Sequence, residues 1–372
     1  MAIVRAVELR LIALPLLAPF RTSFGTETQK ECVLVRVETD DAEGWGECVA
    51  GPDPGFSEEF NEGVWLVLRE FAVPALFAAG DVSSRDLAPV LAGIRGNPMA
   101  RAALVDAFLD AELRAQDVSL AAYLQADRDR VACGVSIGIA STTQDLLDQV
   151  AGYLAQGYRR IKLKIEPGTD VERVAAVRGA FPDTMLSVDA NAAYHLDDVD
   201  VFHALDAFGL LMVEQPLHQD DLVQHAELQA QITTDLCLDE SIRSAADAAA
   251  AIELGACRIV NIKQGRVGGV IEARRVHDVA RAAGVPVWCG GMLETGIGRA
   301  VNLALAAMPG FTLPGDTSAS SRYFTDDLTE PFEMAADGTM EVPKGPGIGA
   351  TPRADRLTAC TQRVETLTRA QK

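Results

Sequence analysis

Five short hydrophobic segments between residues 161 and 265 each end in ionisable side chains. Three of these side chains are carboxylates at equal intervals, because Asp189, Glu214 and Asp239 follow one another at 25 positions. A strand, a helix and two connecting loops occupy roughly that many residues in an α/β protein. The spacing therefore predicts successive βα units in which one charged residue recurs at the same place.

The segments have the composition of strands in a buried parallel sheet. They are almost continuously apolar until their last one or two residues, as expected for strands covered on both faces. In a closed barrel of βα units the C-terminal strand ends converge on one mouth, where the chemistry takes place. Carboxylates gathered there repel one another unless a cation holds them, and their oxygens suit a hard ion such as Mg²⁺ or Mn²⁺. Any one acid alone could be a helix cap or a surface residue, but the equal spacing favours the ion.

Lysines flank the three acids on both sides. Lys162 and Lys164 alternate with Leu163, so both lysines face the same side of their strand. Lys263 ends the sixth predicted strand, almost opposite the second around a barrel. Buried ammonium groups are costly without compensation, and a nearby metal or second cation lowers a lysine pKa. We therefore expect bases at Lys164 and Lys263 and a charge stabiliser at Lys162. The alternative, a solvated pair on an edge strand, conflicts with the apolar neighbours.

The motifs KLK, VDAN, VEQP, LDES and NIK, together with the later GGMLETGIG, resemble the enolase superfamily and its muconate-lactonizing subgroup. Within that subgroup the chain is most similar to o-succinylbenzoate synthases and N-succinylamino acid racemases. The resemblance covers nearly the whole chain, including the N-terminal PFRTSFG. It implies a divalent metal, Mg²⁺ or Mn²⁺, and a pair of acid/base lysines, Lys164 and Lys263, assisted electrostatically by Lys162. The implied metal ligands are Asp189, Glu214 and Asp239.

The resemblance also implies a type of reaction, which is established for the superfamily. A proton α to a carboxylate is removed, and the enediolate is stabilised by the metal and an ammonium group. Reprotonation on the opposite face would racemise an N-succinyl or other N-acyl amino acid. Loss of a β-hydroxyl would instead form o-succinylbenzoate in menaquinone biosynthesis. Because the same residues serve both outcomes, the motifs leave synthase and racemase open.

Other activities of this scaffold remain as alternatives. They are a muconate cycloisomerase-like reaction and dipeptide epimerisation. Dipeptide epimerases usually carry Asp-x-Asp after the eighth strand, whereas this chain has Asp316 without a second acid at Ser318. The mandelate-racemase subgroup has a His-Asp pair where Lys263 stands, so it is disfavoured.

Several further residues are candidates for substrate contact. Arg266 lies three positions after Lys263 and either tunes the pKa of that lysine through its charge or is a surface residue. The glycines after the seventh strand allow close approach of the backbone to a ligand. The polar and aromatic loop from Pro19 to Thr28 is expected to cover the mouth. The predicted substrate contacts are Ser136, Asn191, Gly291, Met292, Glu294, Arg21 and Phe24.

The rest of the chain predicts two domains and a C-terminal segment. Before residue 125, three predicted strands suggest an antiparallel meander, and predicted helices at 58–77 and 98–116 follow them. This order indicates an α+β capping domain over residues 1–125 and not a βα repeat. Seven βα units and a last strand follow, which predicts an α/β fold of the modified TIM-barrel type, (β/α)7β, over residues 126–320. Residues 321–372 are expected to pack back on the capping domain.

Composition restricts the partners. A net charge of −20 argues against nucleic acid but allows a small-molecule carboxylate substrate, because local charge can oppose net charge. We expect no membrane span, and seven dispersed cysteines without metal-site spacing indicate reduced thiols in a cytoplasmic protein. The resemblance implies a homo-oligomer, a dimer or an octamer. A non-catalytic metal-binding barrel would not need both lysines, and an oxidoreductase would need an early glycine motif that this chain lacks.

Overall fold

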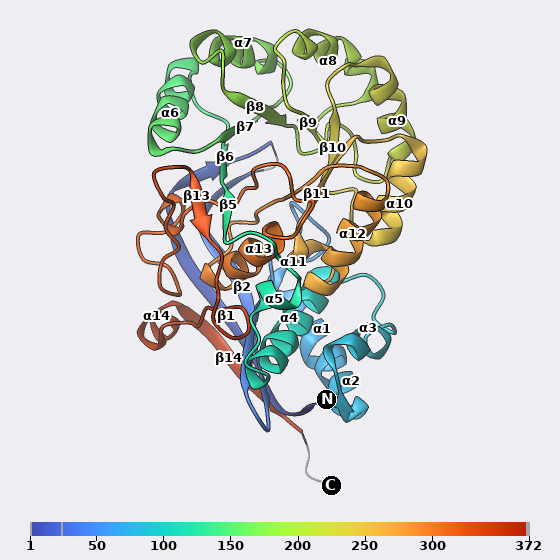
Figure 1. Ribbon diagram of the computed structural model, residues 1–372, viewed down its shortest axis with the longest axis vertical. Coiled ribbons are helices and arrows are strands. Elements are labelled where there is room, and N and C mark those ends of the chain that lie inside the picture. Colours follow the sequence, from blue (N-terminus) through green and yellow to red (C-terminus); the bar gives the residue numbers. More distant parts are fainter. Residues whose placement is uncertain (1, 24, 370–372) are drawn as a thin grey trace.

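An antiparallel sheet and a curled parallel sheet organise the protein, as Figure 1 shows for a computed structural model that describes residues 2–23 and 25–369. The antiparallel sheet has the strand order β14-β1-β2-β3, and the short β4 pairs with β1. Its last strand comes from the far end of the chain, because β14 pairs with β1 from Ala6 opposite Thr368 onward. The strands are β1 (Ala2–Arg21), β2 (Thr26–Thr39), β3 (Glu43–Glu47), β4 (Asp81–Val82) and β14 (Thr361–Thr368).

Strand β2 separates two hydrophobic cores, which explains why its middle is apolar without interruption. Val33, Val35 and Val37 belong to the core under the N-terminal helices, whereas Cys32 and Leu34 belong to the core shared with the parallel sheet. Alternate side chains of a strand point to opposite faces, so both faces of β2 are buried. The antiparallel sheet is therefore a partition between the two halves of the molecule.

Helices cover the outer face of this sheet. Gly44 and Gly46 of β3 let α4 approach closely, because a Cβ atom at Gly44 would lie 2.2 Å from the backbone nitrogen of Ala111. The predicted helix at 58–77 is observed as α1 and α2 joined by a π-helical turn at Leu68–Ala72. The helices are α1 (Asn61–Val67), α2 (Val73–Ala79), α3 (Leu87–Val90), α4 (Pro98–Ala115) and α5 (Leu120–Tyr123).

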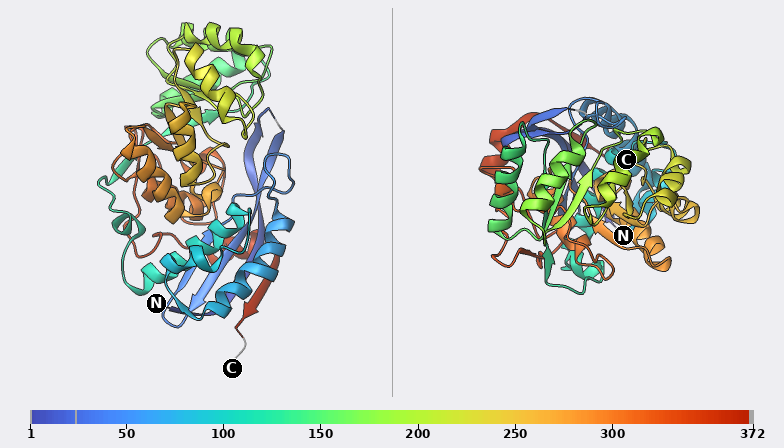
Figure 2. Two further views of the ribbon diagram at one scale, coloured as in Figure 1. Left: turned by 90° about the vertical axis from the view of Figure 1, so that its right-hand side faces the viewer. Right: turned by 90° about the horizontal axis from the view of Figure 1, so that it is seen from above.

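The parallel sheet has seven strands in the order β12-β11-β10-β9-β8-β7-β6, which is their order in the sequence. Helices lie on its outer side (Figures 1 and 2). The strands are β6 (Gly134–Ile137), β7 (Arg160–Lys164), β8 (Met185–Asp189), β9 (Val213–Glu214), β10 (Leu236–Leu238), β11 (Ile259–Ile262) and β12 (Val287–Cys289). The helices are α6 (Thr143–Gln156), α7 (Asp170–Ala180), α8 (Val199–Asp206), α9 (Leu222–Gln231), α10 (Ala245–Leu254), α11 (Gln264–Val267), α12 (Val270–Ala282) and α13 (Gly296–Ala306).

An irregular segment completes the ring where an eighth strand was predicted. Asp316 N donates to the carbonyl of Cys289 at 2.9 Å on the β12 side, and Gly134 N donates to the carbonyl of Gly315 at 2.6 Å on the β6 side. The pairing on each side is one isolated bridge, Val287 with Phe311 and Cys133 with Gly315, and not a ladder. The (β/α)7β architecture is confirmed, with this weak closure. A separate two-stranded antiparallel sheet is formed by β5 (Arg130–Ala132) and β13 (Thr339–Glu341), and α14 (Ala354–Cys360) precedes β14.

The prediction of a loop from Pro19 to Thr28 is wrong. Strand β1 continues to Arg21 and β2 begins at Thr26, because pairing resumes at Phe20 opposite Glu27 after an irregularity that begins at Pro15. This hairpin extends beyond the antiparallel sheet and reaches the parallel sheet (Figure 2). The domain boundaries at 125 and 320 stay predictions. Within the described residues no helix is long and apolar enough to cross a membrane.

Asp106 joins the two halves through a contact that is sensitive to pH. This buried residue of α4 accepts a hydrogen bond at 2.8 Å from Val270 N, in the first turn of α12, and burial raises its pKa to about 7. In the unfolded chain the same carboxyl titrates near an ordinary pKa of about 4. The folded state therefore binds more protons between these values, and stability falls as pH rises through this window.

We expect Asp106→Asn to remove this loss of stability. The amide oxygen can still accept from Val270, but it cannot ionise, so the variant gains about 1 to 3 kcal/mol over the wild type between pH 5 and pH 8. Urea unfolding at the two pH values measures the difference. An equal effect of the substitution at both pH values would contradict the prediction.

Candidate active site

Strand β7 brings two lysines to the mouth of the parallel sheet. Arg160, Lys162 and Lys164 alternate along it and share one face, while Ile161 and Leu163 belong to the hydrophobic core. Arg160 and Lys162 lie over the ring of Trp288, at 4.6 and 4.8 Å from its centroid. Lys162 and Arg160 are buried, and the end of Lys164 lies closer to solvent.

The three predicted metal ligands lie at the ends of three adjacent strands. Asp189 and Glu214 are paired in register at the ends of β8 and β9, and Asp239 directly follows β10. All three carboxylates are buried. The equal spacing in the sequence thus becomes proximity in space, because each βα unit returns the chain to the same edge of the sheet.

Lys162 contacts three carboxylates at once. Its Nζ lies 2.8 Å from Glu214, 3.1 Å from Asp189 and 2.8 Å from Asp316. Lys164 donates to Asp189 at 2.7 Å and to the Oδ1 atom of Asn191 at 2.5 Å. The ammonium groups of β7 therefore neutralise the acids of β8 and β9.

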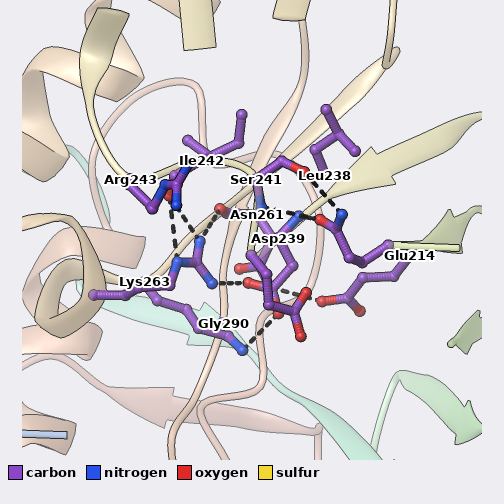
Figure 3. A network of polar contacts seen from close by, with 12 residues as sticks. Glu214, Leu238, Asp239, Ser241, Ile242, Arg243, Asn261, Lys263 and Gly290 are labelled. Carbon is purple, nitrogen blue, oxygen red and sulfur yellow. Dashed lines mark hydrogen bonds and ion pairs between the residues drawn. The ribbon is translucent and has the colours of Figure 1, made fainter. Parts of the chain in front are cut away.

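Asp239 is held by the third lysine and by Arg266. Lys263 Nζ lies 2.7 Å from its Oδ2, and the Arg266 guanidinium donates to its Oδ1. Arg266 is buried and also donates to the carbonyl of Ile242. Figure 3 shows Lys263 and Asp239 facing each other, with Glu214 and Asn261 beside them. Arg266 is therefore not the surface residue that one interpretation allowed.

Burial and the contacting groups of opposite charge shift the pKa of each of these residues in opposite directions. Burial lowers the pKa of Lys162, but Asp316, Glu214 and Asp189 outweigh it, so this pKa lies well above its ordinary value. Burial and then Asp189 raise the pKa of Glu214 to about 8, against the effect of Lys162. For Lys263, burial lowers the pKa and Asp239 raises it beyond the ordinary value, while Arg266 lowers it. That Arg266 tunes the reactivity of Lys263 stays a prediction.

A cavity of about 330 Å³ opens above the three lysines. Its other side is formed by the β1–β2 hairpin, from Gly25 to Glu31, and by residues 51–57. The antiparallel sheet therefore supplies one wall and the parallel sheet supplies the charged floor. Of the predicted substrate contacts, those that line the cavity are Ser136, Asn191, Gly291 and Met292.

Two other predicted contacts, Arg21 and Glu294, do not line this cavity. Arg21 is half-exposed and pairs with Glu166 at 3.3 Å, outside the cavity lining. Glu294 is buried and accepts from Asn302 at 2.9 Å, so it is directed toward α13 and not toward the substrate cavity. Phe24 lies outside the described residues.

Sequence reasoning missed residues that the site contains. Asn261 donates to Glu214 at 2.7 Å, and its position two residues before Lys263 could have revealed it, since both face one side of the strand. Arg160 pairs with Asp316 at 2.5 Å, and the same alternation points to it. The Oε1 atom of Glu240 accepts a hydrogen bond from the Nδ2 atom of Asn191 at 2.9 Å, and no sequence pattern indicates this contact.

The chemistry of the three acids fits a hard divalent ion, because all their ligand atoms are oxygens that converge from adjacent strands. In the described part of the chain no three Asp, Glu, His or Cys side chains already form a metal cage. Ammonium groups lie between the carboxylates instead. An ion bound here would therefore share these oxygens with the lysines.

The fold and the lysine–carboxylate mouth define a barrel enzyme site of the enolase type, and comparison with known proteins agrees. Residues 145–356 match the family described as enolase C-terminal domain-like, and residues 6–124 match the mandelate racemase/muconate lactonizing enzyme N-terminal domain. The chain therefore belongs to the enolase superfamily, as the motifs indicated. Enzymes of this superfamily use divalent metals, typically Mg²⁺.

Several relatives of known name or structure are similar to this chain over nearly its whole length. An N-succinylamino acid racemase from Amycolatopsis is 57% identical, covering 95% of this chain and 96% of its own. An o-succinylbenzoate synthase from Geobacillus kaustophilus is 51% identical over 92% of each chain. A crystal structure of an enolase superfamily member from Listeria innocua is 38% identical, with a TM-score of 0.95 over the full length of both chains. An L-Ala-D/L-Glu epimerase from Bacillus subtilis is more distant, at 27% identity.

The ion pairs of Asp316 yield a prediction about stability. Asp316→Ala leaves the buried Arg160 without its carboxylate and removes one of three from Lys162, which we expect to cost about 3 to 5 kcal/mol of unfolding free energy. Guanidinium unfolding measures it. The matched control is Arg275→Ala, which breaks an exposed pair with Glu272 and should cost less than about 1 kcal/mol. Equal losses in the two variants would show that burial does not matter here.

Proposed function

We propose that the protein removes a proton α to a carboxylate with Lys164 or Lys263 and returns one from the other side. The observation that carries this is the pair of lysine ammonium groups that line one cavity from β7 and from the end of β11. Three strands separate β7 and β11 in the curled sheet. Two bases that approach a carbon from different sides can invert it, which one base cannot do efficiently.

The substrate class that fits best is an N-succinyl or other N-acyl amino acid. The cavity is lined by cationic lysines on its floor, which suits a small-molecule carboxylate despite the acidic composition of the chain. Arg266 supports racemisation, since its buried guanidinium lowers the pKa of Lys263 and so opposes Asp239, which holds that pKa above its ordinary value. The racemase relative at 57% identity supports the same choice.

Synthesis of o-succinylbenzoate is the second candidate. It starts with the same proton removal, and a relative at 51% identity bears that name. Dipeptide epimerisation has less support, because both oxygens of Asp316 are already paired, with Arg160 and with Lys162. An acid in that state offers little to a substrate ammonium group.

The proposed cofactor is Mg²⁺ or Mn²⁺, with Asp189, Glu214 and Asp239 as ligands. A bound ion would withdraw negative charge from the substrate carboxylate and so acidify the adjacent C–H. Lys162 would stabilise the negative charge that develops when the proton leaves, since it is buried and remains charged. Lys164 and Lys263 would hold and return the proton at their Nζ atoms.

Proton NMR in D₂O with Mg²⁺ tests the proposal on each enantiomer of an N-succinyl amino acid. We expect the wild type to lose the α-proton signal and the optical rotation. Lys164→Ala and Lys263→Ala should each abolish racemisation, and each should retain α-proton exchange with only one enantiomer, because the other base is intact. Lys344→Ala is the control, since this lysine is exposed and pairs with Asp129.

Other outcomes would contradict parts of the proposal. If the wild type exchanges no N-acyl amino acid, the racemase assignment is wrong, and the cyclohexadiene substrate of the synthase is the next to be offered. If either lysine variant loses exchange with both enantiomers, the two lysines do not act as separate bases.

Binding of Mn²⁺, followed by electron paramagnetic resonance, tests the metal ligands without any assay of activity. We expect Asp189→Asn, Glu214→Gln and Asp239→Asn each to weaken binding by about tenfold or more, because each removes an anionic oxygen ligand. Asp235→Asn is the matched control at the other end of β10, where the carboxylate pairs with Arg258. Equal affinities of the Asp235 and Asp239 variants would exclude the proposed site.

A further inference from the structure

Asn191 lies between Lys164 and a carboxylate that is not one of the proposed metal ligands. Its Oδ1 accepts from Lys164 Nζ at 2.5 Å, and its Nδ2 donates to the Oε1 atom of Glu240 at 2.9 Å. An amide has an accepting end and a donating end. The carboxylate of Glu240 therefore selects the amide orientation in which oxygen, not NH₂, faces the ammonium group.

The backbone fixes Asn191 in this place. Its φ of 43° lies in the left-handed region, which asparagine adopts more readily than most residues. Its backbone N–H donates to Asp189 at 3.1 Å, and the next residue, Ala192, donates to the carbonyl of Gln215 at 2.8 Å. The amide thus has little freedom except rotation about its own side-chain bonds, and that rotation is what Glu240 restrains.

Glu240 has no evident structural reason to be a carboxylate. It is 8% exposed, and among the described residues its Oε2 atom is buried without a hydrogen-bond partner. A buried, half-satisfied carboxylate is costly. Its one side-chain hydrogen bond in the described part of the chain is the contact with Asn191, so the cost is explained if that contact serves the site.

We propose that Glu240 is a positioning residue that acts through Asn191 to orient the ammonium group of Lys164. This inference rests on the proposed function. Lys263 is positioned by other groups, Asp239 and, through Asp239, Arg266. Loss of the Glu240–Asn191 contact should therefore impair the base on one side of the substrate and spare the base on the other. A residue with a merely structural role would impair both alike.

The test measures α-proton exchange of each enantiomer of an N-succinyl amino acid in D₂O with Mg²⁺. The enantiomer that Lys164→Ala no longer exchanges is the one that Lys164 serves. For this enantiomer, we expect Asn191→Gly and Glu240→Leu to slow exchange by about tenfold or more, since a displaced base costs that much or more. In Glu240→Leu, whose side chain does not line this cavity, exchange of the other enantiomer should stay within about threefold of the wild type. Glycine is chosen because it adopts a positive φ without strain.

Two further variants separate position from charge and from general damage. Glu240→Gln keeps an oxygen that can accept from Asn191, so both enantiomers should exchange within about threefold of the wild type. Asn302→Leu breaks a buried amide–carboxylate bond of the same kind, the 2.9 Å contact with Glu294, and should affect the two enantiomers equally. Circular dichroism and Mn²⁺ affinity confirm that each variant is folded and retains its metal site.

Two results would overturn the inference. One is an equal loss for both enantiomers in Glu240→Leu. The other is a Glu240→Gln variant as asymmetric as Glu240→Leu, which would assign the effect to the charge of Glu240 and not to its hydrogen bond with Asn191. If the wild type exchanges neither enantiomer, the proposed function is wrong, and the positioning role of Glu240 is not what the experiment has contradicted. The two failures are therefore distinguishable.

Discussion

The ammonium group of Lys162 holds together the mouth of the parallel sheet. It contacts carboxylates of β8, of β9 and of the segment that closes the ring. Without a shared cation these acids would repel one another in a buried place, where Coulomb energies are several times larger than in water. Asp316 in turn connects Lys162 with Arg160. The irregular closing segment, which has only isolated bridges to its neighbours, is therefore anchored by charge where a strand ladder is lacking.

The same network gives the two proposed bases different surroundings. Lys164 contacts Asp189 and an amide oxygen, whereas Lys263 contacts Asp239, a carboxylate that Arg266 also holds. Arg266 competes with Lys263 for the charge of Asp239, and nothing equivalent to this guanidinium contacts Asp189 in the described residues. A reaction with two bases depends on the surroundings of both Lys164 and Lys263. A reaction with one base depends on the surroundings of only one of these lysines.

The parallel sheet and the charged residues at its strand ends could be predicted from the sequence, because repeated βα units place similar residues at regular intervals. The interval of 25 residues reflects one βα unit, and strand alternation places Lys162 and Lys164 on one face. The family motifs supplied the roles, which spacing alone does not. The β1–β2 hairpin was mistaken for a loop because Pro15 and Pro19 interrupt its pattern, although pairing resumes beyond them. Glu240 escaped notice because its partner, Asn191, lies 49 positions away on another strand end.

The division of the cavity between two sheets explains why the motifs leave the reaction open. The charged floor comes from strand ends whose spacing is dictated by the βα repeat, so it is nearly the same for any reaction that begins with proton removal. The facing wall comes from the hairpin at Gly25–Glu31 and from residues 51–57, which have no repeat to restrain them. Substitutions in this wall can change which substrate fits without moving a lysine. The choice of substrate is therefore expected to lie mainly in the antiparallel half of the molecule, outside the motifs that identify the family, whereas Arg266 in the parallel half acts on one of the bases.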